Sequence, residues 1–138
     1  MALGLQDFAG RWRLDRRIRD ALAGREGRFR GAALFRPEGS TLFYRERGEL
    51  TLDGTAMAAE QTHVWRQEGN RICVVFADGR PFHAFELGVA TAEARHDCDA
   101  DRYRVSYDFA DWPEWRTEWR VRGPRKDYTL TSRYLRTA

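Results

Sequence analysis

Four polar side chains on two neighbouring segments form the sharpest candidate site in the sequence. Tyr44 and Glu46 precede an Asp53-Gly54 pair, and Gln61 and His63 follow it. An Asp-Gly pair between alternating runs is typical of a two-residue hairpin turn. Counting outward from that turn puts Glu46 opposite Gln61 and Tyr44 opposite His63, on one face of a sheet. A carboxylate near an imidazole can form a general acid–base pair. The same groups can equally anchor a polar ligand or hydrogen-bond one another.

Further polar and aromatic side chains are expected to face the same interior, which favours a cavity over a solid core. A solid core must give each buried polar group a partner, as Arg16 could have in Glu46, whereas a cavity accommodates such groups with water or ligand. Small-molecule sites mix apolar walls with a few polar groups in this way. The remaining interior polar positions are Cys98, Thr117, Tyr128, Ser132 and Tyr134. We expect a small-molecule ligand to contact Tyr44, Glu46, Gln61, His63, His83, His96, Tyr103, Tyr107 and Trp119.

The segment around His96 and Cys98 raises two further alternatives. On a strand these two side chains face the same way, a spacing that metal ligands can have, but a structural zinc site needs about four ligands and few others are in evidence. A Cys–His nucleophile pair is a second reading. We favour a third, in which Asp97 and Asp101 shape a tight turn. No metal and no cofactor are therefore expected, and no catalytic residue is assigned.

A sheet of short strands must position these side chains. Turn signals recur roughly every ten to fifteen residues with alternating apolar runs between them, which is typical of an all-β sandwich or barrel. The signals are Arg36 to Ser40, Asp53-Gly54, Glu68 to Asn70, Asp78-Gly79, Asp99-Ala100, Trp112-Pro113 and Gly123 to Lys126. A two-residue turn at Asp78-Gly79 would pair Val74 with His83, Ile72 with Phe85 and Arg71 with Glu86.

The outward faces that follow from these registers carry two predictions. Arg47 and Glu60 should meet as a solvent-exposed pair of opposite charge, which tests the register of their hairpin. Val75 and Phe82 should point outward together as an apolar patch. Such a patch suits a homodimer or a protein-interaction module.

The start of the chain resembles the calycin superfamily, which includes the lipocalins and the fatty-acid-binding proteins. Gly10-Arg11-Trp12 matches the Gly-x-Trp opening of those families. The resemblance implies a single all-β domain over residues 1–138. Its fold would be an antiparallel up-and-down barrel of about ten strands with a short N-terminal helical turn. It also implies that Trp12 packs at the closed end beneath an Arg of the last strand, here Arg136 or else Arg133, by cation–π stacking.

Two segments, His96 to Tyr103 and Gly123 to Tyr128, resemble a small family of bacterial and fungal domains with no assigned function. The chain departs from better-known relatives. Arg19 to Arg25 is too short for the helical lid of fatty-acid-binding proteins, and Tyr134-Leu135-Arg136 reverses their carboxylate-binding Arg-x-Tyr order. A Gly-rich haem-barrel motif is also absent. Neither a fatty acid nor haem is therefore expected.

The composition excludes several classes of protein. A chain of 138 residues with two Cys fits one domain without a disulfide framework. Its net charge of +3 comes from 24 basic and 21 acidic residues that alternate, so no nucleic-acid partner is expected. No apolar run suits a signal peptide or a membrane span, which predicts a cytoplasmic location. We therefore expect a small-molecule binder. The alternatives are a barrel enzyme (an isomerase, decarboxylase or hydrolase) using Glu46 and His63, or an interaction module.

Overall fold

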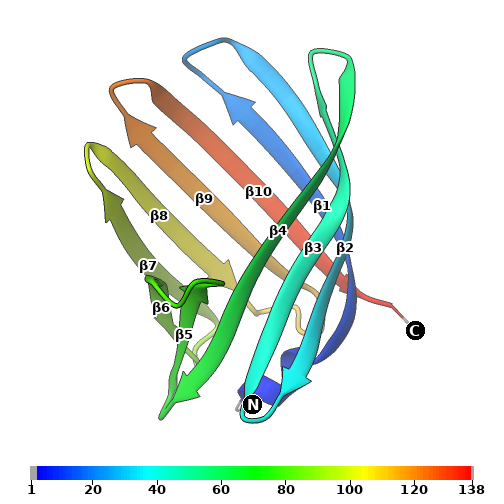
Figure 1. Cartoon of the computed structure of the whole chain (residues 1–138), viewed down its shortest axis with the longest axis vertical. Helices are drawn as coiled ribbons and strands as arrows, with labels where there is room; N and C mark the ends of the chain where they lie inside the picture. The colour runs from blue at the N-terminus through cyan, green and yellow to red at the C-terminus, as the bar shows by residue number, and fades with distance from the viewer. Residues whose placement is uncertain (1–2, 138) are drawn as a thin grey trace.

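Ten antiparallel strands form one sheet that curls into a nearly closed up-and-down barrel in the computed structural model, which describes residues 3–137 (Figure 1). A single 3-10 turn, η1 (Leu5–Phe8), precedes them. The strands are β1 (Gly10–Asp20), β2 (Arg25–Glu38), β3 (Thr41–Leu52), β4 (Thr55–Glu68), β5 (Arg71–Phe76), β6 (Pro81–Glu86), β7 (Thr91–Cys98), β8 (Asp101–Asp108), β9 (Trp115–Gly123) and β10 (Lys126–Arg136). The fold class predicted from the sequence is confirmed.

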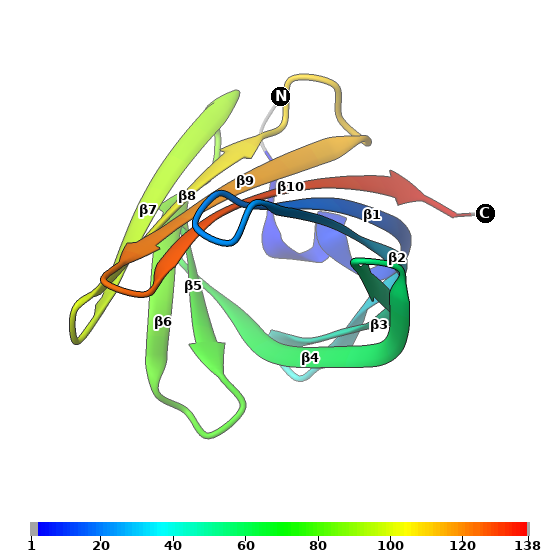
Figure 2. The same cartoon turned by 90° about the horizontal axis from the view of Figure 1, so that it is seen from above.

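The first and last strands lie side by side, and this pairing closes most of the barrel. The sheet order is β6-β5-β4-β3-β2-β1-β10-β9-β8-β7, so β6 and β7 are its two edges. Within residues 3–137 no backbone ladder joins these edges, and we call the gap between them the seam. Figure 2 shows the same sheet from above, with its strands arranged around a common centre. In the described residues, no helix is both long enough and apolar enough to cross a membrane.

The hairpin at Asp53-Gly54 has the predicted turn and register. Asp53 has φ 49° and Gly54 has φ 78°, the positive values that a type I′ turn requires. Each predicted pair across β3 and β4 forms, including Tyr44 with His63. Arg47 and Glu60 pair on the outside, with an Nε–Oε2 distance of 3.5 Å. The register test is therefore met.

The hairpin between β5 and β6 differs from its prediction. All three predicted pairs form, Arg71 with Glu86, Ile72 with Phe85 and Val74 with His83, but the register then shifts, and Val75 pairs with Pro81. A proline has no N–H for a ladder, so it occupies strand starts and bulges. The irregularity turns Phe82 inward, where its ring stacks on Trp119 with centroids 5.1 Å apart. The prediction of an outward Val75–Phe82 patch is wrong, and the homodimer hypothesis loses its patch.

The closed end of the barrel is packed as the calycin resemblance implies. The Trp12 indole is fully buried, and its Nε1–H donates to the Phe8 carbonyl oxygen at 2.9 Å. The Arg136 guanidinium carbon lies 3.9 Å from the centroid of the Trp12 ring, and Nη1 donates to the Ala9 carbonyl oxygen at 2.7 Å. Arg136, not Arg133, is thus the partner of Trp12. The contacts of Arg136 therefore link the last strand to the start of the first strand.

Candidate ligand-binding cavity

A cavity of about 150 Å³ lies inside the barrel above the aromatic closed end. Liquid water takes roughly 30 Å³ per molecule, so the space holds about five waters or one benzene-sized ring. Every strand except β2 and β7 contributes to its wall. The lining residues are Arg16, Tyr44, Glu46, Gln61, His63, Trp65, Val74, Phe82, His83, Tyr103, Tyr107, Trp115, Thr117, Trp119, Val121, Leu130 and Tyr134.

The nine residues predicted to contact a ligand all line this cavity except His96. His96 is half-buried on the edge strand β7, where it packs edge-on against Phe82 with ring centroids 5.2 Å apart. His96 thus contacts a ring that lines the cavity without lining it itself. Sequence reasoning missed Phe82 because a two-residue turn would have placed it outside. The only sequence signal for its inward position is Pro81, which favours an irregular strand start.

Two other residues predicted to face the interior lie outside its enclosed part, and a third, Ser132, is buried but does not line the cavity. Cys98 ends β7 and is exposed, so that prediction is wrong. Tyr128 is half-buried near the start of β10, at the opposite end of the barrel from Trp12, and does not line the cavity. Both lie where the strands extend past the enclosed interior, so facing inward there does not mean burial. Within residues 3–137 there is no group of three or more His, Cys, Asp or Glu side chains that could hold a metal ion.

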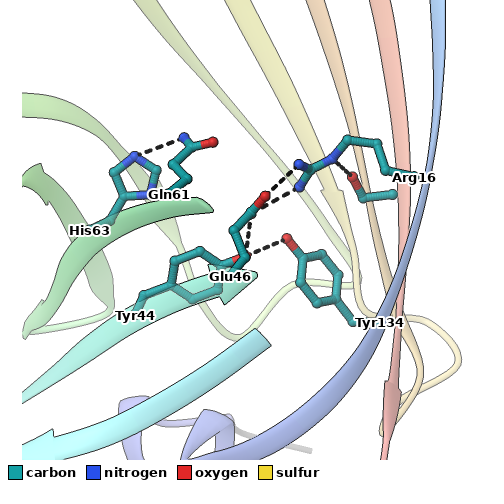
Figure 3. Close-up of polar contacts among 7 residues, drawn as sticks. Arg16, Tyr44, Glu46, Gln61, His63 and Tyr134 are labelled. Carbon is teal, nitrogen blue, oxygen red and sulfur yellow. Dashed lines mark hydrogen bonds and ion pairs between the residues drawn. The ribbon is translucent and has the colours of Figure 1, made fainter. Parts of the chain in front are cut away.

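A buried ion pair anchors one side of the cavity (Figure 3). Arg16 on β1 donates from Nη1 and Nη2 to the Glu46 carboxylate on β3, at 2.7 and 3.1 Å, and from Nε to the Ser132 hydroxyl at 2.7 Å. The Tyr44 hydroxyl donates to Glu46 Oε1 at 2.7 Å and lies 3.1 Å from the Tyr134 hydroxyl. Side chains from three separate strands thus form one hydrogen-bonded network.

This network keeps its two full charges and balances them. Burial by itself would raise the pKa of Glu46, but the adjacent Arg16 and the Tyr44 hydroxyl hold that pKa below its ordinary value. Burial opposes the charge on Arg16, and Glu46 more than compensates, so the pKa of Arg16 is raised. Burial also raises the pKa of Tyr44, and that of Tyr134 to about 12. The network therefore has no net charge near neutral pH.

The two histidines of the cavity are both neutral near pH 7. His63 Nε2 lies 3.2 Å from Gln61 Nε2, and His83 Nε2 lies 2.6 Å from the Tyr107 hydroxyl. Burial lowers the pKa of His63 despite the nearby Glu46 carboxylate. Burial lowers the pKa of His83 to about 3, and the neighbouring histidines add to the shift. Neither imidazolium is available to bind an anion at neutral pH.

The acid–base pair considered for an enzyme does not form in the described structure. Glu46 and His63 both point inward, as that hypothesis requires. The Glu46 oxygens accept from Arg16 and Tyr44, whereas the His63 ring contacts Gln61. A carboxylate held in this way is a weak proton acceptor, because a base needs a free lone pair and a suitable pKa. The geometry favours binding over proton transfer.

Comparison with solved structures supports the barrel. The S-type phycobiliprotein lyase CPES from Guillardia theta has a similar fold, with a TM-score of 0.68 and 10% sequence identity over 97% of this chain and 90% of that chain. A protein of unknown function from the DUF3598 family of Nostoc punctiforme has a TM-score of 0.60 and 7% identity, over 96% of this chain and 48% of that one. At such identities the likeness shows the fold alone.

Sequence comparison adds a family. Residues 8–136 match the model of a family described as "Family of unknown function (DUF6314)". No curated protein matches the chain significantly. The matched range runs from Phe8 at the closed end to Arg136, the partner of Trp12. The family match therefore covers the whole barrel.

Proposed function

The chain belongs to the DUF6314 family of unknown function, and we propose that it is a small-molecule-binding protein whose ligand occupies the barrel cavity. The observation that carries this proposal is the composition of the cavity wall. A hydrogen-bonded polar network lies on one side and aromatic rings lie on the other, around space that no side chain fills. Small-molecule sites combine apolar walls with a few placed polar groups in this way.

The polar wall supports binding because side chains of a purely structural core would be apolar. Arg16 and Glu46 satisfy each other, but a buried ion pair is commonly no more stabilising than an apolar pair of similar size. Their position beside an unfilled space therefore favours a role in shaping a site. The barrel is also consistent with the calycin resemblance of the Gly10-Arg11-Trp12 opening.

The size of the cavity limits the ligand. Pockets for drug-sized ligands are typically about 300–1,000 Å³, and this one is about 150 Å³. A ligand held wholly inside is therefore small. Similarity to the phycobiliprotein lyase supports the barrel as a frame for a functional site, and it does not assign the lyase's activity to this chain.

The ligand is proposed to contact Tyr44, His63 and Trp119. Tyr44 and His63 bring hydrogen-bonding groups from the β3–β4 hairpin, and Trp119 brings a large apolar surface with one N–H donor from β9. Tyr44 and His63 lie side by side, with ring centroids 5.9 Å apart, and Trp119 belongs to another part of the sheet, β9. A ligand that touches all of them would span the space between the polar network and the aromatic side.

The test is a crystal structure of protein purified from cells, read for density inside the barrel, together with a thermal-shift screen of small metabolites. A ligand at a hundredfold its Kd adds about 2.7 kcal/mol of stability. Thr117→Phe, which fills the cavity, should abolish the shift. Thr131→Phe, the same change at an exposed position of β10, should leave it intact. Equal shifts in both variants, or an interior found packed and dry, would show that the cavity does not bind ligand.

A further inference from the structure

A hollow of about 320 Å³ lies on the outside of the barrel. It spans β9, β10, β1 and β2, which are neighbours in the sheet (Figure 1). Its lining is rich in arginine and consists of Asp15, Arg17, Arg28, Arg116, Thr131, Ser132 and Arg133. No residue lines both this hollow and the ligand cavity. We propose that the hollow binds a phosphomonoester, a phosphate group carried by a single organic substituent.

The register of the sheet creates the hollow by placing two short side chains diagonally between two long ones. Thr131 lies opposite Arg17, and Asp15 lies opposite Arg133. Arg16 faces the cavity, so its neighbours Asp15 and Arg17 on β1 face outward. The space above the two short side chains is therefore walled by two guanidinium groups.

Pairs of like charge flank the hollow. Arg17 lies opposite Arg28, and Arg133 lies opposite Arg116. Like charges in directly opposite positions destabilise a sheet. An anion bound among these guanidinium groups would relieve that repulsion.

Two carboxylates contact three of these arginines. Asp15 accepts hydrogen bonds from Arg28 Nε and Nη2 at 3.0 and 2.8 Å. Glu114 accepts one each from Arg116 Nη2 and Arg133 Nη2, at 2.7 and 3.0 Å. Each carboxylate therefore serves its own side of the hollow.

Arg17 has no carboxylate of its own. Within residues 3–137 it forms no ion pair and donates no side-chain hydrogen bond, so its full set of N–H donors is free. Glu118, opposite Thr131, also forms no ion pair among the described residues, and it does not line the hollow. The four arginines of the lining outnumber the two carboxylates that contact them, an excess of two positive charges. A phosphomonoester carries close to two negative charges at neutral pH, which matches this excess.

The carboxyl group of Asp15 responds to the excess of positive charge. The hydrogen bond from Arg28 lowers the pKa of Asp15, burial acts in the opposite direction, and the charges of Arg30 and Arg17 lower the pKa further. A negative charge at this place is thus stabilised by arginines beyond its own hydrogen-bond partner.

The donors suit the oxygens of a phosphate better than those of a carboxylate. Arg17 and Arg133 stand on opposite sides of the hollow. A guanidinium can bind phosphate oxygens through two parallel N–H donors. The exposed Thr131 hydroxyl has no hydrogen-bond partner in the described chain and can donate to a further oxygen. Donors that converge from several directions favour a phosphate, which has three terminal oxygens.

The test is an NMR titration of the full, isotope-labelled chain with glycerol 3-phosphate at constant ionic strength. At about pH 7.5 the phosphate group is mostly a dianion, since its second pKa is about 6. Backbone amide and arginine Nε–Hε signals report the contact. We expect shifts that saturate and that centre on Arg17, Thr131 and Arg133.

Matched variants locate the site. Arg17→Gln should weaken binding at least about fivefold, because it removes the guanidinium whose donors are all free. Arg13→Gln makes the same charge change on the same face of β1, at an exposed position outside the hollow, and should weaken binding less than about twofold. Thr131→Phe fills the hollow and should abolish binding. Thr117→Phe, which fills the cavity, should leave it intact, the reverse of the pattern for a cavity ligand.

Other anions test the chemical class. Dimethyl phosphate and acetate each carry one negative charge and should bind at least about fivefold more weakly than glycerol 3-phosphate. A short phosphoserine peptide tests the source of the phosphate group. Binding of either monoester through Arg17 supports the proposal, and the tighter of the two identifies a small molecule or a phosphorylated protein as the source.

Three outcomes would overturn the proposal. Shifts that never saturate, or equal weakening by Arg13→Gln and Arg17→Gln, would show diffuse attraction to a basic surface. Equal binding of dimethyl phosphate would assign the hollow to phosphodiesters such as those of nucleic acids. Loss of binding in Thr117→Phe but not in Thr131→Phe would place the phosphate in the cavity. None of these results bears on whether the cavity binds an uncharged ligand.

Discussion

The closed end and the cavity of this barrel are built on the same strands. They differ in the side chains that those strands direct into the interior. On β1 the inward side chain is Trp12 at the closed end and Arg16 at the cavity, two periods further along, with Leu14 between them. On β9 the change is from Trp115, which is 1% exposed, to the half-buried Trp119. A β-strand keeps its pleat through such a change, because every second side chain faces inward regardless of type. One scaffold therefore carries two environments.

The contrast separates folding from function. At the closed end, the Phe8, Trp12 and Trp115 rings fill the space, with Phe8 and Trp115 centroids 5.4 Å apart at 90°. Packing of this kind contributes to stability in proportion to the apolar area buried. In the cavity, polar groups leave space unfilled. Truncation of an aromatic side chain should therefore cost more unfolding free energy at the closed end than in the cavity, and ligand affinity should depend on the cavity residues.

The largest expected effect is that of Trp12→Ala. Removing a fully buried Trp side chain costs about 3–5 kcal/mol of unfolding free energy, because it loses apolar burial and leaves a cavity. Trp119→Ala, the same change in the wall of an existing cavity, should cost less than half as much. Urea denaturation of both variants measures the difference. Equal losses would show that the two ends of the barrel are packed alike.

A smaller effect is expected from breaking the buried ion pair. Glu46→Leu leaves the Arg16 charge buried without its partner, which should cost about 3 kcal/mol of unfolding free energy. The double variant Arg16→Met with Glu46→Leu should recover most of that loss, since no uncompensated charge then remains. Urea denaturation of the unmodified protein, of Glu46→Leu and of the double variant measures the loss of unfolding free energy and its recovery.

Glu60, on the outer face of the barrel, offers a matched control for the Glu46→Leu measurement. It contacts Arg45 at the same 2.7 Å distance, but in solvent. Glu60→Leu should have a much smaller effect than Glu46→Leu, because exposed pairs gain little. A double variant no more stable than Glu46→Leu would contradict the assigned role of the pair.

The smallest expected effect concerns pH. Folded His83 binds a proton only near pH 3, whereas an unfolded His does so near 6.5. Between those values the unfolded state therefore holds more protons, so stability is constant above about pH 6.5 and falls below it. One such group contributes at most about 1.4 kcal/mol per pH unit. His83→Phe should flatten the fall between about pH 6.5 and 5 in urea denaturation.

Measurements above about pH 7.5 provide the internal control, because both proteins should be insensitive to pH there. His63, whose pKa burial also lowers, should leave part of the fall in place in His83→Phe. An unchanged slope in the variant would mean that His83 titrates like an exposed histidine.

Much of the barrel could be predicted from the sequence because its signals are local. The Asp53-Gly54 turn sets the register of β3 and β4 and so determines that Tyr44, Glu46, Gln61 and His63 share a face. The Gly10-Arg11-Trp12 opening correctly indicated the closed end and its contact with Arg136. Turn chemistry and side-chain alternation act over a few residues, so they can be read without knowledge of the rest of the chain.

The site itself depended on contacts that no local pattern contains. The irregularity that leaves Phe82 unpaired between Pro81 and His83 turned its ring inward. His96 contacts that ring without lining the cavity, and Cys98 is exposed where β7 ends. Alternation specifies which face a side chain takes but not how far the enclosed interior extends along a strand. It also does not specify whether inward side chains fill the space between them. By itself the sequence determined the strands and their faces, and only the closure of the sheet decided which of those side chains surround a cavity.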